Sequence, residues 1–539
     1  MTPGRAPAPG FTLTLNSALP KLAWLARVNH GPAPTAVVWH GTAVECLDGA
    51  FVEGIWDGPY EQGRFDESAN FFGSGARVVG DGLTFVSSAA MVDCLWYKGD
   101  QDTTWVSNSL PLLLSATGDR LSPGYRGYHT FQDSLLAGFR RCEKDLVTER
   151  GGVSRVVVGN LEIDRAGARV VDKPLPPNFA TYQDYVDYLV AAYGRLRANI
   201  GDPARRTALE LFSTQSRGYE TTAVNAIAAG GGIDQVFTCP DARDKASYLG
   251  RERAGQPSDD GSEICQRLGL PCTKIDRLSF LKGFPEETLF FAGYYRGMDV
   301  NLREIGQHVS SVAVMITGAA GDMWESIALD KEVFHEKTGS FGTTDLTLHG
   351  IGEYRLHAGL IQLPVPMIAG RRRDDIHHIT RLGEMDPFRM GGHYDRPVAR
   401  RIAEERGVER EMFGQQKMNV TIAFPKPAMP FSPELRAAYL DYLAEEKVLP
   451  RWKQAFLPLI YRLNEVLHYR SPKRYVAAFY GLYYAQRILR KLTGRTPPFG
   501  ILWANLSGSI FCFSVNRVAQ ENYDQVLAAL PEPSDTLSG

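Results

Sequence analysis

The sequence lacks paired cysteines, and this absence excludes the common cysteine-built sites. Seven cysteines are scattered over 539 residues, with no C-x-x-C pair and no histidine at zinc-finger spacing. A structural zinc site is therefore not expected. The odd number of cysteines favours a reducing cytoplasm as the compartment.

Charge of one sign and long apolar runs are also lacking. The 59 basic and 61 acidic residues are well mixed and give a formal net charge of −2. Binding to nucleic acid or to an anionic membrane needs a basic surface, so no nucleic-acid partner is expected. No apolar run approaches the ~18 residues that a membrane span needs. Because Asn16, Pro20 and Lys21 interrupt the faintly apolar start, we expect a soluble cytoplasmic protein without a signal peptide.

The length and a change of pattern along the chain predict two domains. A chain of 539 residues exceeds one ordinary hydrophobic core. Short strand patterns between glycine and aspartate turns fill residues 37–160, and a proline-rich break at 173–178 precedes an amphipathic helix at 182–197. We therefore place a β-rich domain at 1–175 and a second domain at 176–539.

The second domain alternates strand and helix patterns, which is typical of a parallel sheet with helices on both faces. The expected strands are 208–213, 235–239, 272–276 and 311–318, and the expected helices begin at Thr221 and Ser262. From about residue 345 onward the chain is expected to be chiefly helical, except for a buried strand at 510–515. The aromatic, basic stretch 473–491 predicts a helix, either a lid over this domain or an interfacial helix or partner-docking surface.

A glycine-containing turn at 216–222 opens the helix after the first of these strands. Such a turn gathers backbone N–H groups and the positive end of a helix at one spot, which suits a phosphate. The segment resembles the pyrophosphate loop, Ser-Gly-Gly-x-Asp-Ser, of the asparagine synthetase-like ATP pyrophosphatases. The resemblance implies a magnesium ligand at Glu220, and it implies ATP-phosphate contacts at Ser216, Gly218, Thr221 and Thr222.

A second glycine loop follows the strand expected at 311–318. Gly318 and Gly321 precede Asp322, and the segment is similar to the Ser-Gly-x-Gly-x-Asp segment of the same family. The resemblance implies that both glycines approach the nucleotide and that Asp322 joins Glu220 as a Mg²⁺ ligand. The two loops follow strands whose carboxyl ends meet at one edge of a parallel sheet.

Two further segments supply the catalytic candidates. Residues 352–364 are similar to the Glu-x-Arg-x-Pro-Phe segment of the family, which makes Glu353 the candidate general base or orienting group near acyl transfer. The alternative is a buried Glu353–Arg355 ion pair that fixes a helix start. Lys417 lies where the family has a lysine beside the α-phosphate, which implies an electrostatic role. A surface lysine is the alternative there.

Arginines are concentrated between these segments, at 371–373 and within 396–401. Three arginines within six residues suit bidentate binding of an anionic substrate group. The alternative is a solvated helix face, since Glu404 and Glu405 supply acidic neighbours.

The β-rich first domain is loosely similar to the glutaminase domain of the same family, at 81–88 and 105–113. Glutamine hydrolysis in the family uses an N-terminal cysteine whose own amine acts as the base. The first cysteine of this chain is Cys46. We therefore expect a degenerate, non-catalytic Ntn-amidohydrolase-like domain, as in β-lactam synthetases and lasso-peptide cyclases.

Together the resemblances imply an α/β protein that is an ATP-dependent C–N ligase with ATP and Mg²⁺ as cofactors. A small-molecule or peptide carboxylate would be adenylated with release of pyrophosphate, and an amine donor would take the acyl group. Three departures from the family pattern, at Arg217, Glu220 and Ala319, support the alternative of a catalytically inactive nucleotide-binding or scaffold protein. The acyl substrate and the formation of a homo-oligomer are left open.

Overall fold

The structure is a computed structural model of the chain. It describes residues 8–100, 102–240, 243–244, 259–276, 279–324, 346–391, 394–415, 418–419, 430, 432–449, 454, 488, 491–493 and 498–528. The predicted catalytic residue Lys417 and most of the predicted helix at 473–491 lie outside these residues.

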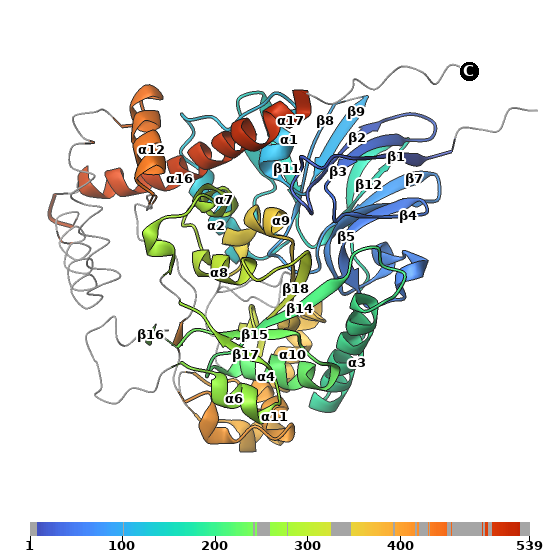
Figure 1. The fold of residues 1–539 in the computed structure, drawn as a ribbon, viewed down its shortest axis with the longest axis vertical. Helices are drawn as coiled ribbons and strands as arrows, with labels where there is room; N and C mark the ends of the chain where they lie inside the picture. Colours follow the sequence, from blue (N-terminus) through green and yellow to red (C-terminus); the bar gives the residue numbers. More distant parts are fainter. Residues whose placement is uncertain are drawn as a thin grey trace, which may run out of the picture.

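Two β-sheets pack face to face in the N-terminal region (Figure 1). The first has the strand order β1 (Gly10–Leu15), β3 (Thr35–His40), β2 (Trp24–Asn29), β9 (Thr103–Ser107), β8 (Leu95–Gly99), β11 (Gly151–Val156) and β10 (Asp145–Thr148). The second has the order β13 (Gly167–Asp172), β12 (Gly159–Asp164), β7 (Gly82–Val86), β6 (Phe71–Val79), β5 (Ala50–Trp56) and β4 (Glu45–Leu47). Between the sheets, the Trp24 ring lies 5.0 Å from Phe51 and 6.0 Å from Phe85. The β-rich N-terminal region is thus confirmed.

A third sheet, formed by strands after residue 208, is parallel. Its order is β17 (Cys272–Lys274), β15 (Gln235–Thr238), β14 (Leu209–Thr214), β18 (Val312–Thr317) and β19 (Leu360–Pro364). The chain first winds outward from β14 to β17 and then continues on the other side with β18 and β19. The winding therefore reverses between β14 and β18, at what is called the topological switch point. The predicted mixed α/β class with a parallel sheet is confirmed.

The helices predicted at 182–197 and from Thr221 and Ser262 are present as α3 (Tyr182–Ile200), α4 (Tyr219–Ala228) and α6 (Ser262–Arg267). The N-terminal region also contains α1 (Leu110–Ala116). Thr181 and Asp184 form a capping box that starts α3, each side chain accepting a backbone N–H of the other residue. The remaining helices are α2 (Tyr128–Asp133), α7 (Glu287–Gly293), α8 (Arg303–Gly306), α9 (Tyr354–Ala358), α10 (Arg373–Ile379), α11 (Pro397–Glu405), α12 (Pro433–Glu445), α16 (Pro498–Val518) and α17 (Gln525–Ala528).

The predicted strand at 510–515 is wrong, because this run lies inside the helix α16. All six of its side chains are buried, since α16 packs against α7, α2, α1 and α12. A continuous apolar run does not distinguish a strand from a helix that is covered on several sides. Asn516 of α16 also accepts the N–H of Leu121 and donates to its carbonyl, which fixes α16 on the N-terminal region.

The region after residue 345 also contains β19, a strand that the prediction of a chiefly helical region missed. All five of its residues are buried, as expected for the outer position of a parallel sheet covered on both faces. Among the described helices, none has both the length and the hydropathy needed to cross a bilayer.

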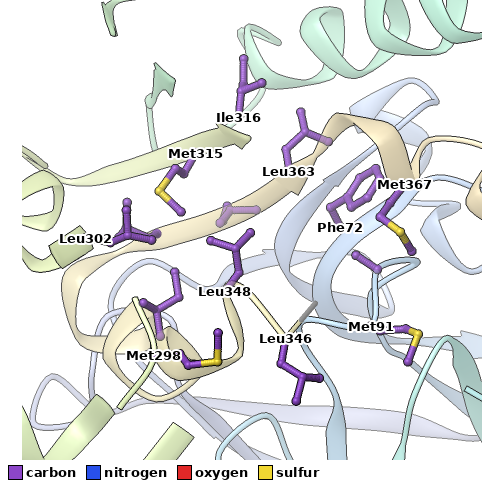
Figure 2. Packing of buried hydrophobic residues seen from close by; sticks show 14 of the residues in the cluster. Phe72, Met91, Met298, Leu302, Met315, Ile316, Leu346, Leu348, Leu363 and Met367 are labelled. Atoms are coloured by element: carbon purple, nitrogen blue, oxygen red, sulfur yellow. The ribbon is translucent and has the colours of Figure 1, made fainter. Parts of the chain in front are cut away.

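One hydrophobic core joins the parallel sheet to the N-terminal region. Figure 2 shows Met315 and Ile316 of β18, Leu363 of β19, and Phe72 of β6 around the same core, with Met91 from the loop that follows β7. Methionine side chains are unbranched and fill irregular gaps between sheets that do not share a register. The predicted domain boundary near 175 falls between β13 and α3, and the packing is continuous across it.

Candidate functional site

The two predicted glycine loops meet at the topological switch point. β14 and β18 are parallel neighbours, and their carboxyl ends lead into residues 215–218 and 318–321 respectively. A Cβ atom built on Gly318 would lie 2.6 Å from the Cβ of Glu220, and one built on Gly321 would lie 2.2 Å from the Cγ of Glu220. Glycine is therefore required at both positions for the loops to approach this closely.

Hydroxyl groups hold the first loop in shape. The Ser216 Oγ accepts the Gly218 N–H at 3.1 Å, and the Thr221 Oγ1 accepts the Ser216 N–H at 3.2 Å. The buried Thr222 Oγ1 donates to the Gly218 carbonyl at 2.7 Å. The four predicted phosphate-contacting residues thus lie together at the start of α4, and they also stabilise one another.

Arg217, which replaces a glycine of the family pattern, is held by other parts of the chain. Its Nε donates to the Met412 carbonyl at 3.0 Å, and its guanidinium lies 3.6 Å from Glu263. Its backbone N–H donates to the Asp259 carboxylate at 2.9 Å. The side chain is thus bound beside the turn, while one N–H of the predicted phosphate cradle already contacts a carboxylate.

The two carboxylates predicted to bind magnesium are each close to a buried arginine. Glu220 forms an ion pair with Arg396 and accepts a hydrogen bond from the Tyr394 hydroxyl at 3.2 Å. Asp322 lies 3.7 Å from the guanidinium of Arg373. Burial lowers the pKa of Arg396 to about 9, which still leaves the guanidinium charged at neutral pH.

This arrangement does not fit a Mg²⁺ ion held by Glu220 and Asp322. Magnesium takes carboxylate oxygens in a near-octahedral shell, and two guanidinium groups at the same carboxylates repel it and occupy its ligands. In the described part of the chain, no three His, Cys, Asp or Glu side chains form another group suited to a metal ion. Guanidinium groups and backbone N–H donors suit a phosphate instead.

Asp322 is positioned from both sides. It belongs to the short 3-10 helix at Gly321–Trp324, and the Trp324 indole N–H donates to the Tyr185 hydroxyl of α3 at 2.9 Å. Arg373 is the first residue of α10, which follows β19. The residues after the carboxyl ends of β14, β18 and β19 therefore converge on one place.

Glu353 lies elsewhere, at the other edge of the parallel sheet. It immediately precedes α9, and α9 is followed by Gly359, whose carbonyl accepts the N–H of Ala313 near the start of β18. The Ser109 hydroxyl lies 3.0 and 2.9 Å from the two Glu353 oxygens, and the Tyr523 hydroxyl donates to Oε1. Burial raises the pKa of Glu353 to about 7 despite these hydrogen bonds. The structure does not bring Glu353 to the two glycine loops.

The predicted alternative, an ion pair between Glu353 and Arg355, is replaced by a different one. The Arg355 guanidinium donates to both oxygens of Glu53 at 3.0 Å, and its Nε lies 2.6 Å from Asp93. All three groups are buried. Arg355 therefore links α9 to β5 of the N-terminal region, a role that no sequence motif indicated.

A cavity of about 80 Å³ lies beside this ion cluster. Its charged and polar lining includes Asp93, Arg155, His349, Glu353 and Arg355. Burial lowers the pKa of His349 to about 3, so this imidazole is neutral at physiological pH. The volume has room for a few water molecules.

The arginines within 396–401 do not all follow the same one of the two predicted alternatives, anion binding and a charged helix face. Arg400 is buried against the Tyr219 ring and donates to the Tyr219 hydroxyl. Arg401 pairs with Glu384 at 2.8 Å and with Glu405 at 2.7 Å, as the interpretation of a charged helix face predicts. Arg396 alone of these three reaches Glu220 among the described contacts.

In comparisons with known proteins, no protein-family model and no curated protein matches the chain.

Proposed function

We propose that the switch point between β14 and β18 binds the phosphates of ATP, and that the chain is an AMP-forming C–N ligase of the asparagine synthetase-like kind. One observation carries the proposal: two glycine loops about a hundred residues apart in sequence touch at the point where a parallel sheet binds its ligands. The buried arginines Arg396 and Arg373 add positive charge there.

In this proposal a substrate carboxylate attacks the α-phosphorus of ATP. The bond from that phosphorus to the bridging oxygen breaks, and pyrophosphate leaves into the loop at 216–222. An amine then attacks the acyl carbon, AMP leaves, and the amine loses a proton as the amide forms. In this proposal no glutamine hydrolysis is assigned to the N-terminal region, in which Cys46 lies on β4.

The position of Glu353 removes it from the reacting atoms in this proposal. It lies at the amino edge of the sheet, whereas the loops lie at the carboxyl edge. Glu353 instead positions the segments that contact it, through its hydrogen bonds with Ser109 and Tyr523.

Product analysis tests the ligase. The protein is incubated with ATP and a panel of carboxylic acids and amines, and we expect AMP and pyrophosphate in equal amounts, dependent on the acid. Formation of ADP and phosphate would contradict the proposal. Gly321→Val fills the space next to Glu220 and should abolish turnover, while Gly194→Ala, at an open position on α3, should not.

A non-catalytic nucleotide-binding protein is the second candidate. The specific observation in its favour is that Glu220, Asp322 and the Arg217 N–H all contact groups of the protein itself. Calorimetry separates the candidates, because ATP binding without AMP formation across the panel would favour the second.

A further inference from the structure

Arg396 lies between the two glycine loops. It pairs with Glu220 of the first loop, and its Nη1 would be 3.4 Å from a Cβ built on Gly321 of the second. Its guanidinium also lies 5.5 Å from the centre of the Tyr394 ring, and the Tyr394 hydroxyl donates to Glu220. The position that a metal ion would take between Glu220 and the second loop is thus occupied by a guanidinium.

Because the guanidinium group of Arg396 is buried, leaving its positive charge without an anion would cost much free energy. Arg396 is 5% exposed and Arg373 is 6% exposed, so neither is screened by water as a surface arginine would be. Each lies beside a carboxylate, Glu220 for Arg396 and Asp322 for Arg373. A diphosphate carries more charge than one carboxylate and offers oxygens to two guanidinium groups at once.

A separate observation at the same edge also points to a ligand. Thr317, the last residue of β18, is 6% exposed, and its hydroxyl has no hydrogen-bond partner within the described part of the chain. A buried hydroxyl without a partner costs free energy. It lies next to Gly318, at the start of the second loop, where a bound phosphate oxygen would supply the missing partner.

We propose that this site binds a nucleoside di- or triphosphate, or pyrophosphate, without a divalent metal ion, with Arg396 and Arg373 neutralising the phosphates and Glu220 acting as an internal anion that the ligand displaces. The proposal rests on the proposed function for the identity of the ligand. It reverses the role predicted for Glu220, which here opposes binding instead of promoting it.

Calorimetric titration with inorganic pyrophosphate tests this directly, in buffer with EDTA and in buffer with Mg²⁺. We expect binding in EDTA that is no weaker than binding in Mg²⁺, because Mg²⁺ in solution removes charge from the pyrophosphate. Binding that requires Mg²⁺ would overturn the proposal, and so would the absence of binding under both conditions.

Two variants sharpen the result. Glu220→Gln removes the competing charge and should tighten pyrophosphate binding about tenfold, the size of one charge-assisted hydrogen bond. A metal-binding role for Glu220 predicts the opposite, a loss of affinity. Arg396→Gln should weaken binding at least tenfold, and Arg401→Gln on the same segment, paired with Glu384 and Glu405, should leave it unchanged. If Arg396→Gln does not fold, the sign of the Glu220→Gln effect still decides.

The failure of this proposal is distinguishable from that of the ligase. Pyrophosphate bound in EDTA without AMP formation from any acid would contradict the ligase and leave the arginine site standing. AMP formation that needs Mg²⁺ and is lost in Glu220→Gln would contradict the arginine site and leave the ligase standing.

Discussion

Arginine–carboxylate clusters lie at both edges of the parallel sheet, and they differ in how they are held. The amino-edge cluster consists of Glu53, Arg355 and Asp93, and its charged contacts are all 2.6 to 3.0 Å. Ser74 and Asn108 also donate to Glu53, at 2.6 and 3.3 Å. All three guanidinium nitrogens of Arg355 and both oxygens of Glu53 are thus engaged, which is the arrangement of a permanent cross-link. Asp93 Oδ1 also accepts from the Gln362 amide at 3.0 Å, while its Oδ2 has no partner among the described residues.

The carboxyl-edge cluster consists of Glu220, Arg396, Asp322 and Arg373. Its residues come from loops and helix starts, and the Asp322–Arg373 contact is 3.7 Å. Both glycine loops contact it through Glu220. The comparison sets a fixed joint, in which one arginine bridges two carboxylates of the N-terminal region, against a pair after the carboxyl ends of strands that, in our proposal, a ligand separates.

The largest expected effect is the loss of the fixed joint. Arg355→Leu leaves the carboxylates of Glu53 and Asp93 buried without their cation, and should lower the free energy of unfolding by about 3–5 kcal/mol. Denaturant titration followed by tryptophan fluorescence measures this. Arg373→Leu should cost less, because its carboxylate contact is longer. Equal losses would remove the distinction between the two clusters.

A pH-dependent effect is expected next, at Glu353 beside the amino-edge cluster. Burial raises its pKa from 4.5 to about 7, so the folded state holds a proton that the unfolded chain has released. The stabilisation from this proton is complete below pH 4.5 and is lost as the pH rises through 7. Relative to the wild type, Glu353→Gln should therefore gain roughly 3 kcal/mol in stability between pH 5 and pH 8. Parallel stability curves for the two proteins would contradict this.

A smaller effect is expected at Ser109, which joins α1 to Glu353. Its hydroxyl accepts the Leu112 N–H as the N-cap of α1 and contacts both Glu353 oxygens. Ser109→Ala should cost about 1–2 kcal/mol through the lost cap and hydrogen bond. Thermal unfolding measures it, with Ser17→Ala, at an exposed turn, as the control. A loss no larger than that of the control would mean that Ser109 contributes little to either contact.

The smallest effect on stability is expected at the carboxyl edge. Gly321→Ala places a Cβ 2.2 Å from the Glu220 Cγ, so Glu220 has to move away from Arg396. The cost in stability should be about 1 kcal/mol, while the affinity for pyrophosphate should change several-fold. Gly194→Ala, an open helical position, should stabilise the fold slightly. A stability loss without any change in affinity would show that the Glu220–Arg396 pair does not meet the ligand.

The sequence was sufficient to predict the meeting of the two glycine loops. Strand patterns alternating with helices imply a parallel sheet, and in such a sheet residues that follow neighbouring strands lie together whatever their separation. Asp322 and Glu220 could therefore be placed at one edge. Their arginine partners could not, because Arg373 and Arg396 depend on how α10 and α11 pack, and no local spacing encodes that.

The position of Glu353 could not be predicted for a related reason. Because the strand β19 was not predicted, the sequence did not indicate at which edge of the parallel sheet the segment around residue 353 lies. The five buried residues of β19 carry no alternation that separates a strand from a helix. The partner of Arg355 lies 302 residues earlier, at Glu53, so the ion pair is a property of the tertiary fold.

The helix α16 is synthesised long after the N-terminal helices that it packs against. Leu121, whose backbone it holds through Asn516, is made 395 residues earlier. At about 5–20 residues per second, translation takes roughly 20–80 s to deliver the helix that covers α1 and α2. For that interval the apolar surface of these helices faces water in the nascent chain. Slower translation or the loss of a chaperone should therefore promote aggregation first through the surface that α16 covers.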